Sequence, residues 1–145
     1  MRGLFVYGSL RFPEILDALL GRVPPLAPAA VPGFRVRALP GVTYPGMVAD
    51  PDSTAEGVLI TGLSDDEQRL LDEFEDELYE PALLPLADGS GLARAYVWRG
   101  ETEPYDWDPA CFAEHHLTAF AERCREWANG RSRSAHCPGN HRAPF

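Results

Sequence analysis

The stretch that decides the fold is LFVYGSL, residues 4–10. Its first four residues are apolar and rich in aromatic and β-branched side chains, which is typical of a buried strand. Gly8 and Ser9 then end the strand. A glycine and a small polar residue directly after a buried strand expose backbone amides at the bend, and such amides can hold a carboxylate or an oxyanion. An ordinary turn from a strand into a helix has the same sequence, so both interpretations stand at this point.

Short strands and three helical segments follow this first strand. Pro13 can occupy the first turn of a helix that runs to about Leu20 and closes at Gly21. Strands that outnumber the helices without regular alternation favour an α+β domain over a doubly wound sheet. The predicted strands cover residues 34–39, 57–61, 78–86 and 92–99, and the last two are joined as a hairpin by Asp88-Gly89-Ser90-Gly91.

Proline marks segments that a central strand does not contain. Residues 22–33 are dense in proline and are predicted to form a covering loop. Tyr44-Pro45-Gly46 reads as a turn or as the entry to a strand. Pro81 and Pro85 make the strand over 78–86 an edge strand or an irregular one.

Residues 64–76 are predicted to form a helix with a well-marked start. Ser64 and Glu67 form an S-x-x-E capping box. At about 100° per residue, Leu71 lies in the buried stripe and Asp72 lies on the opposite, solvated side. The whole stripe consists of Leu70, Leu71 and Phe74, and the solvated side carries Asp65, Asp72, Glu73 and Asp76.

Glu75 is set apart from the other acids by helical phase, because it lies one turn beyond Leu71 at the edge of the apolar face. A carboxylate directed towards the core costs free energy unless it has a partner, and burial raises the pKa of such a group. It is therefore a candidate general base near neutral pH. A glutamate at such an edge can equally be a surface residue whose stem packs while its carboxylate reaches solvent.

A second long helix is predicted to open at Asp108-Pro109 and to end at Gly130. Residues 131–145 hold three arginines, no acids and little apolar content, so we expect a loosely ordered tail beyond a domain of residues 1–130. The spacing of three or four residues defines the packing face of the helix as Phe112, His116, Phe120, Cys124 and Trp127.

The charge of the chain excludes several classes of function. The 145 residues carry 22 acids and 13 bases, a net charge of -9, which argues against nucleic acid or an anionic membrane as a partner. Nine of the acids lie in residues 64–80 against one base. All bases are arginines, so chemistry that needs a protein lysine, such as a Schiff base, is excluded.

The cysteine count and the apolar runs favour a cytoplasmic protein. The three cysteines are an odd number and no signal peptide precedes them, which indicates reduced thiols. No stretch reaches the roughly 18 apolar residues of a membrane span. Cys124, His136, Cys137 and His141 do not have the spacing of zinc ligands, so no metal is expected.

Taken together, the motifs resemble those of the gamma-glutamylcyclotransferase-like family, which includes the gamma-glutamylamine cyclotransferases and the plant avirulence-induced proteins. Residues 4–10 are similar to its V-Y-G-[ST]-[LN] signature. The resemblance covers roughly residues 3–99. The later pieces follow in the family's order: Tyr44-Pro45, EGVL at 56–59, LDEFE at 71–75, and Tyr79.

This resemblance implies an α+β fold, a small mixed β-barrel with flanking helices, and a cavity between the loop over residues 7–10 and Glu75. In the family's reaction a gamma-glutamyl amine or amino acid cyclises to 5-oxoproline and releases the free amine, without metal or cofactor. The resemblance implies that Glu75 is the general acid/base. The implied substrate-binding residues are Tyr7, Gly8, Ser9, Leu10 and Tyr79.

One departure and one alternative accompany the resemblance. Many relatives carry an arginine two positions after the tyrosine, whereas this chain has Pro81, so a substrate contact or an ion pair is lost or replaced. The alternative is a non-catalytic protein that binds a small carboxylate in the same pocket. Glu75 favours the enzyme, because binding an anion gains nothing from a buried carboxylate. The leaving amine and the oligomeric state stay open.

Overall fold

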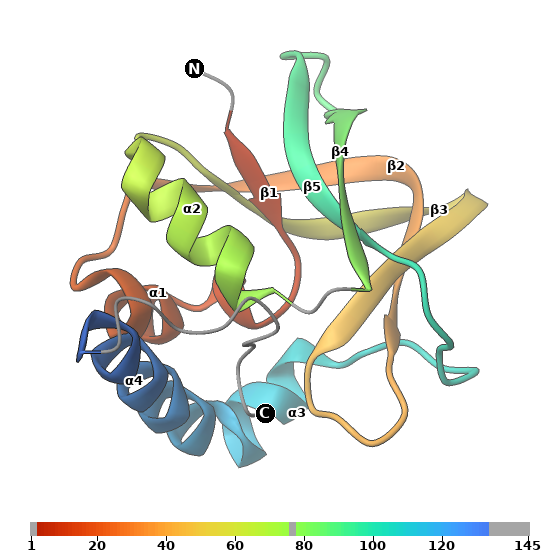
Figure 1. The fold of residues 1–145 in the computed structure, drawn as a ribbon. Coiled ribbons are helices and arrows are strands. Elements are labelled where there is room, and N and C mark those ends of the chain that lie inside the picture. Colours follow the sequence, from red (N-terminus) through yellow and green to blue (C-terminus); the bar gives the residue numbers. More distant parts are fainter. Residues whose placement is uncertain (1–2, 76–77, 134–145) are drawn as a thin grey trace.

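A computed structural model describes residues 3–75 and 78–133 of the chain. It contains one five-stranded sheet with helices α1, α2 and α4 gathered on one side of it (Figure 1). The elements in order are β1 Leu4–Val6, a 3₁₀ turn η1 Ser9–Arg11, α1 Pro13–Leu20, β2 Leu26–Ala38, β3 Pro45–Ile60, α2 Asp65–Phe74, β4 Tyr79–Pro85, β5 Leu92–Trp98, α3 Pro109–His115 and α4 Leu117–Arg133.

The central strand β1 is the apolar run that opens the chain, and all three of its residues are buried. The strand order is β2-β3-β1-β5-β4, with β1 antiparallel to β3 and parallel to β5. Gly57 permits the close approach of β3, because a Cβ there would lie 2.3 Å from the Val6 carbonyl oxygen. Because β1 has one antiparallel and one parallel neighbour, the sheet is mixed. The loop that follows β1 therefore starts from the centre of the sheet.

The α+β class is confirmed. The sheet curls towards a barrel, but its two edge strands do not pair with each other. Its two edges are β2 and β4. Just beyond β4, the amide of Ala87 donates to the Ala30 carbonyl of β2 at 2.9 Å. Prolines on both edge strands remove donors that a further strand would need. The prediction that Pro81 and Pro85 mark an edge strand is thereby confirmed.

The prediction of a covering loop over residues 22–33 is wrong, because β2 begins at Leu26. Pro28 and Pro32 are compatible with a strand here because β2 has only β3 as a neighbour. Gly33 has φ +83°, and the register with β3 shifts beside it, as in a β-bulge. The partner strand is also longer than the predicted 57–61, since β3 spans Pro45–Ile60.

Two apolar cores lie on the two faces of the sheet. The larger one packs the sheet against the helices and includes Leu16, Leu71 and Phe120. The smaller one fills the inside of the curl and includes Phe5 and Met47. All five side chains are between 0% and 1% exposed, so they belong to the buried centres of the two cores.

The helix predicted over 108–130 is two helices, with a break at His116. Asp108 caps the first, because its carboxylate accepts from the Ala110 amide at 2.9 Å. His116 is exposed rather than on the packing face, whereas the other four predicted positions are buried. Gly130 does not end α4, which continues to Arg133. The rest of the expected tail, residues 134–145, lies outside the described residues.

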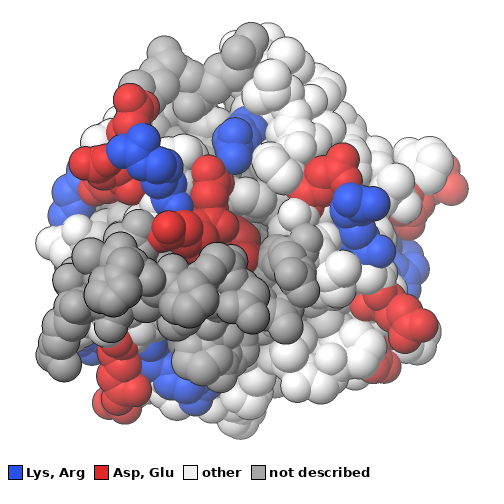
Figure 2. Space-filling model, viewed as in Figure 1, with Lys and Arg blue, Asp and Glu red and all other residues white. Residues whose placement is uncertain are grey.

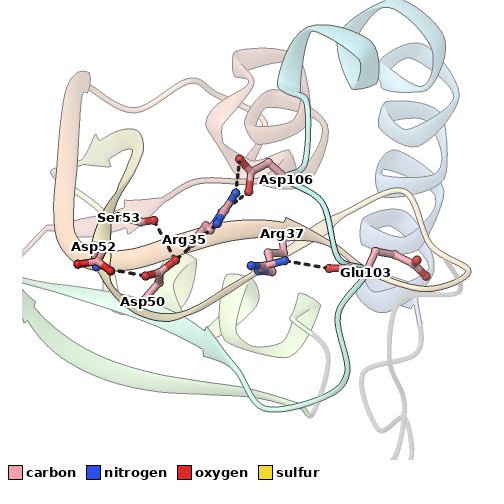
Figure 3. A network of polar contacts seen from close by, with 7 residues as sticks. All are labelled: Arg35, Arg37, Asp50, Asp52, Ser53, Glu103 and Asp106. Atoms are coloured by element: carbon pink, nitrogen blue, oxygen red, sulfur yellow. Dashed lines mark hydrogen bonds and ion pairs between the residues drawn. The ribbon is translucent and has the colours of Figure 1, made fainter.

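Arginines of β2 hold the segment that leads into α3 (Figure 3). Arg35 Nε donates to the Asp106 carboxylate at 2.5 Å and also pairs with Asp50 at 3.6 Å. Arg37 donates to the Glu103 carbonyl at 3.4 Å. These contacts fix the chain between β5 and α3. Of the helices described, none is long and apolar enough to cross a membrane.

Candidate active site

A cavity of about 230 Å³ lies where the end of β1, the end of α2 and helix α4 meet. It brings together all six residues that the sequence singled out, namely Tyr7, Gly8, Ser9, Leu10, Glu75 and Tyr79. The rest of its lining is mostly apolar and aromatic: Phe5, Val6, Tyr44, Pro45, Phe74, Tyr96 and Phe120. Few polar groups on an apolar wall are typical of a pocket for a small molecule.

The loop after β1 is shaped by a close contact with the start of β3. A Cβ on Gly8 would lie 2.8 Å from Pro45 Cδ, so only glycine fits here without movement. The chain then makes the 3₁₀ turn, in which Arg11 N donates to Gly8 O at 3.1 Å and Phe12 N to Ser9 O at 3.2 Å. The first amides of such a turn have no acceptor within it, and Ser9 and Leu10, which carry these amides, both line the cavity.

Glu75 is the C-cap of α2. The helix ends at Phe74, whereas the sequence predicts an end at residue 76. The amide of Glu75 donates to the Leu71 carbonyl at 3.2 Å, and the backbone of Glu75 is extended. Leu71 and Phe74 are buried in the larger core and fix this end of the helix. Phase and burial together therefore bring a partly buried carboxylate to the cavity.

The pKa values of two phenols in the cavity wall are raised by burial and by the charge of Glu75. Burial, and after it the charge of Glu75, raise the pKa of Tyr7 well above its usual value. The same two causes come first for Tyr96, whose pKa is also raised. Both phenols therefore stay protonated at any ordinary pH. The Tyr7 hydroxyl donates to the Tyr96 carbonyl at 2.6 Å and accepts from the Met47 amide at 3.2 Å, so it ties three strands together.

Tyr79 stands among aromatic side chains on the β4 side of the cavity. Its ring centroid lies 4.9 Å from that of Trp98, 6.3 Å from that of Tyr96 and 6.5 Å from that of Tyr44. Its hydroxyl donates to the carbonyl of Pro45. The hydroxyl thus holds the start of β3 against the cavity, and the ring forms part of the wall.

Asp72 has partners that the helical pattern does not predict. Its side chain is 36% exposed, in keeping with the solvated side of the helix, but its carboxylate also accepts from the Tyr96 hydroxyl and from Arg94 Nη2 at 3.1 Å. The helical pattern could not reveal this, because the partners come from β5. Pro81, where many relatives have an arginine, lies opposite Tyr96 in the β4–β5 register, and on the neighbouring strand Arg94 forms an ion pair with Asp72.

Most of the acid run forms a solvated surface, as the sequence indicated. Figure 2 shows acidic side chains gathered over the part of the face where α2 lies, with arginines among them. Asp65, Asp66 and Glu73 are exposed. Within residues 3–75 and 78–133, no group of three or more His, Cys, Asp or Glu side chains is placed to hold a metal.

A mixed α+β domain with a small aromatic cavity that contains a glutamate is typical of proteins that bind a small molecule. The sequence model of the family described as "Gamma-glutamyl cyclotransferase, AIG2-like" matches residues 4–115, so the chain belongs to this family. The resemblance that the motifs indicated is confirmed.

Relatives and solved structures agree with this membership. AIG2-like protein C of Arabidopsis thaliana is 34% identical over 135 residues, which cover 88% of this chain and 78% of the relative. A solution structure of another Arabidopsis thaliana protein has a TM-score of 0.64 at 26% identity and covers 90% of this chain and 92% of its own. A structure named gamma-glutamyl cyclotransferase shares the fold, with a TM-score of 0.56 at 14% identity over 86% of each chain. Family and fold indicate a cyclotransferase-type enzyme, while the names of the AIG2-like relatives state no substrate.

Proposed function

We propose that the protein is a gamma-glutamyl cyclotransferase that converts a gamma-glutamyl amine or amino acid into 5-oxoproline and the free amine. The observation that carries this proposal is the meeting of Glu75 with the loop over residues 7–10 in one cavity. The volume of about 230 Å³ is below the roughly 300–1,000 Å³ of pockets for drug-sized ligands, which suits the glutamyl half of such a substrate.

Glu75 is the general acid/base of the proposed reaction. The substrate's α-amino group is an ammonium near pH 7 and cannot attack until a base removes a proton. Glu75 takes this proton, and the amine forms a bond to the gamma-carbonyl carbon of the same molecule while the carbonyl electrons move to its oxygen. Glu75 passes the proton to the leaving nitrogen and takes the second proton from the attacking nitrogen. The carbonyl then re-forms as the bond to the leaving nitrogen breaks, and the released amine takes up the second proton and leaves as an ammonium. Because nucleophile and carbonyl are covalently connected, most of the entropic cost of their encounter is avoided.

Two groups of the substrate need hydrogen-bond donors during this reaction, the α-carboxylate and the oxyanion that develops on the gamma-carbonyl. The amides of residues 8–10 are suited to one of them, since they begin a helical turn at the cavity. The aromatic wall around Tyr79 and Tyr96 would exclude water from the glutamyl chain. The reaction needs no metal or cofactor, because the nucleophile belongs to the substrate.

The experiment is to incubate the purified protein with a panel of gamma-glutamyl amines and gamma-glutamyl amino acids and to measure 5-oxoproline. We expect at least one member of the panel to release 5-oxoproline and free amine in equal amounts. The competing function is a non-catalytic protein that binds a small carboxylate in the same cavity. Thermal stabilisation by glutamate or 5-oxoproline, with no 5-oxoproline formed from any member, would favour that function instead.

A further inference from the structure

A polar network joins α2 to β5 beside the cavity. The Asp72 carboxylate accepts from the Tyr96 hydroxyl, and Arg94 Nη2 lies 3.1 Å from both of its oxygens. Gln68, one turn earlier on α2, donates through Nε2 to Asp72 at 3.2 Å and lies 3.3 Å from the Tyr96 hydroxyl. The network therefore fixes where the Tyr96 hydroxyl points.

Tyr96 hydrogen-bonds to Asp72 and shares a cavity wall with Glu75. Its ring lines the cavity together with Glu75, and the residue is 5% exposed. Its single phenolic proton is donated to Asp72. Burial raises the pKa of Tyr96, and the charge of Glu75 raises it further. Asp72 and Glu75 are three residues apart at the end of α2, a spacing that makes side chains neighbours on a helix, and the phenolic proton beside them goes to Asp72.

We propose that Asp72 is a positioning residue that keeps the Tyr96 hydroxyl from donating to Glu75 and so preserves Glu75 as a proton acceptor. A hydrogen bond from a phenol stabilises the charged form of a carboxylate and makes it a weaker base. Arg94 offsets the charge of Asp72, which lets two carboxylates stand close to one phenol. The catalytic consequence rests on the proposed function, whereas the hydrogen-bond competition does not.

Other polar and charged side chains around the cavity also affect the titration of Glu75. Tyr7 faces the cavity from the end of β1, and Arg123 of α4 lies 5.8 Å from the ring centroid of Phe120, which lines the cavity. The groups to be considered in any titration of the cavity are Tyr7, Tyr44, Gln68, Asp72, Tyr79, Arg94, Tyr96 and Arg123.

The test is an NMR titration of the full chain with ¹³C-labelled glutamate carboxyls, in which Glu75→Gln assigns the Glu75 signal. We expect Asp72→Ala to move the Glu75 titration to lower pH by roughly one unit, because Tyr96 then donates to Glu75 and a like charge is lost. In the Tyr96→Phe background the same substitution should give a clearly smaller shift, because only the loss of charge remains. Equal shifts in the two backgrounds would overturn the proposal.

Two further variants keep the test decisive. Tyr96→Phe alone should leave the Glu75 titration near that of the unaltered protein, and a rise of about one unit would show that Tyr96 already donates to Glu75. This comparison holds even if Asp72→Ala fails to fold. Asp65→Ala removes an equal charge from an exposed position of α2 and should leave the curve unchanged. Formation of 5-oxoproline is measured in a separate assay, and its failure would contradict the proposed function. The role of Asp72 is decided by the NMR titration alone.

Discussion

Gly8 shows how a single residue can set the geometry of the cavity. The chain passes so close to Pro45 at this point that any side chain must displace either the loop or the start of β3. Both segments line the cavity, and Pro45 also accepts the Tyr79 hydroxyl. The glycine of the opening motif is thus explained by a contact that lies 37 residues away in the sequence.

Gly8→Ala should lower turnover of gamma-glutamyl substrates by about tenfold or more, because small displacements of binding groups have large effects on rate. The measurement is kcat/KM for 5-oxoproline formation, with circular dichroism to verify folding. Gly130→Ala is the matched control, because a Cβ at that helical position meets nothing within 4 Å. Activity of a folded Gly8→Ala protein equal to that of the Gly130→Ala protein would contradict this account of the loop.

The residues of the site differ in how far the sequence could reveal them. Glu75 could be found because helical phase separates it from its neighbours, and residues 7–10 because a glycine follows a buried strand. Tyr96 and Asp72 could not, because their contact joins a helix to a strand 24 residues away and no local pattern records it. The signal missed at Asp72 was the Arg94 two residues before Tyr96, on the same face of β5.

At the scale of elements, α2 shows both what local sequence determines and what it leaves out. The capping box was predictable and is complete: Glu67 N donates to Ser64 Oγ at 3.1 Å and Ser64 N to Glu67 Oε1 at 3.0 Å. Arg22, which follows α1, adds two hydrogen bonds to Glu67 at 2.6 and 2.7 Å. This link between helices could not be predicted, because it depends on how they pack.

Glu67 should make the start of α2 sensitive to acid. Hydrogen bonds from Arg22 lower the pKa of Glu67 to about 2 from an ordinary value of 4.5. Because the pKa is lower in the folded state, the stabilisation is present above about pH 4.5 and is lost as the pH falls towards 2. Glu67→Gln should therefore flatten the fall in urea midpoint between pH 5 and pH 2.5.

The control for this titration is Glu14→Gln, at an exposed glutamate in the first turn of α1. It should leave the slope as in the unaltered protein. If Glu67→Gln and Glu14→Gln gave the same pH dependence as the unaltered chain, Glu67 would have no special role in acid stability.

Longer elements were predicted with mixed success for physical reasons. Helix α1 was predicted with its bounds, because Pro13 and Gly21 mark its ends and Gly21 has φ +76°. Strands β2 and β3 were predicted too short, because proline is tolerated in an edge strand and polar residues are tolerated on a wet face. The break at His116 left no mark in the apolar spacing, since Phe112 and Phe120 stay in one core on either side of it.

At the scale of the whole molecule, two cores share one sheet. Strand β1 contributes to both, with Leu4 and Val6 in the larger core and Phe5 in the smaller. A short central strand that serves both faces couples them, so we expect the domain to unfold as one unit.

Leu16→Ala in the larger core and Met47→Ala in the smaller should each lower the free energy of unfolding by about 2–5 kcal/mol. Both side chains are 0% exposed, so each substitution leaves a cavity. Urea unfolding followed by tryptophan fluorescence and by circular dichroism should give one coincident transition for both variants. Two separate transitions would mean that the cores unfold independently.

The central claim concerns Glu75, and one comparison tests it most directly: 5-oxoproline formation by the unaltered protein and by Glu75→Gln. We expect the folded variant to bind 5-oxoproline but to lose about 10²- to 10⁴-fold in kcat, because the substrate ammonium has no base. Asp65→Asn, at an exposed carboxylate on the same helix, should retain full activity. A folded Glu75→Gln protein as active as the unaltered chain would contradict the account.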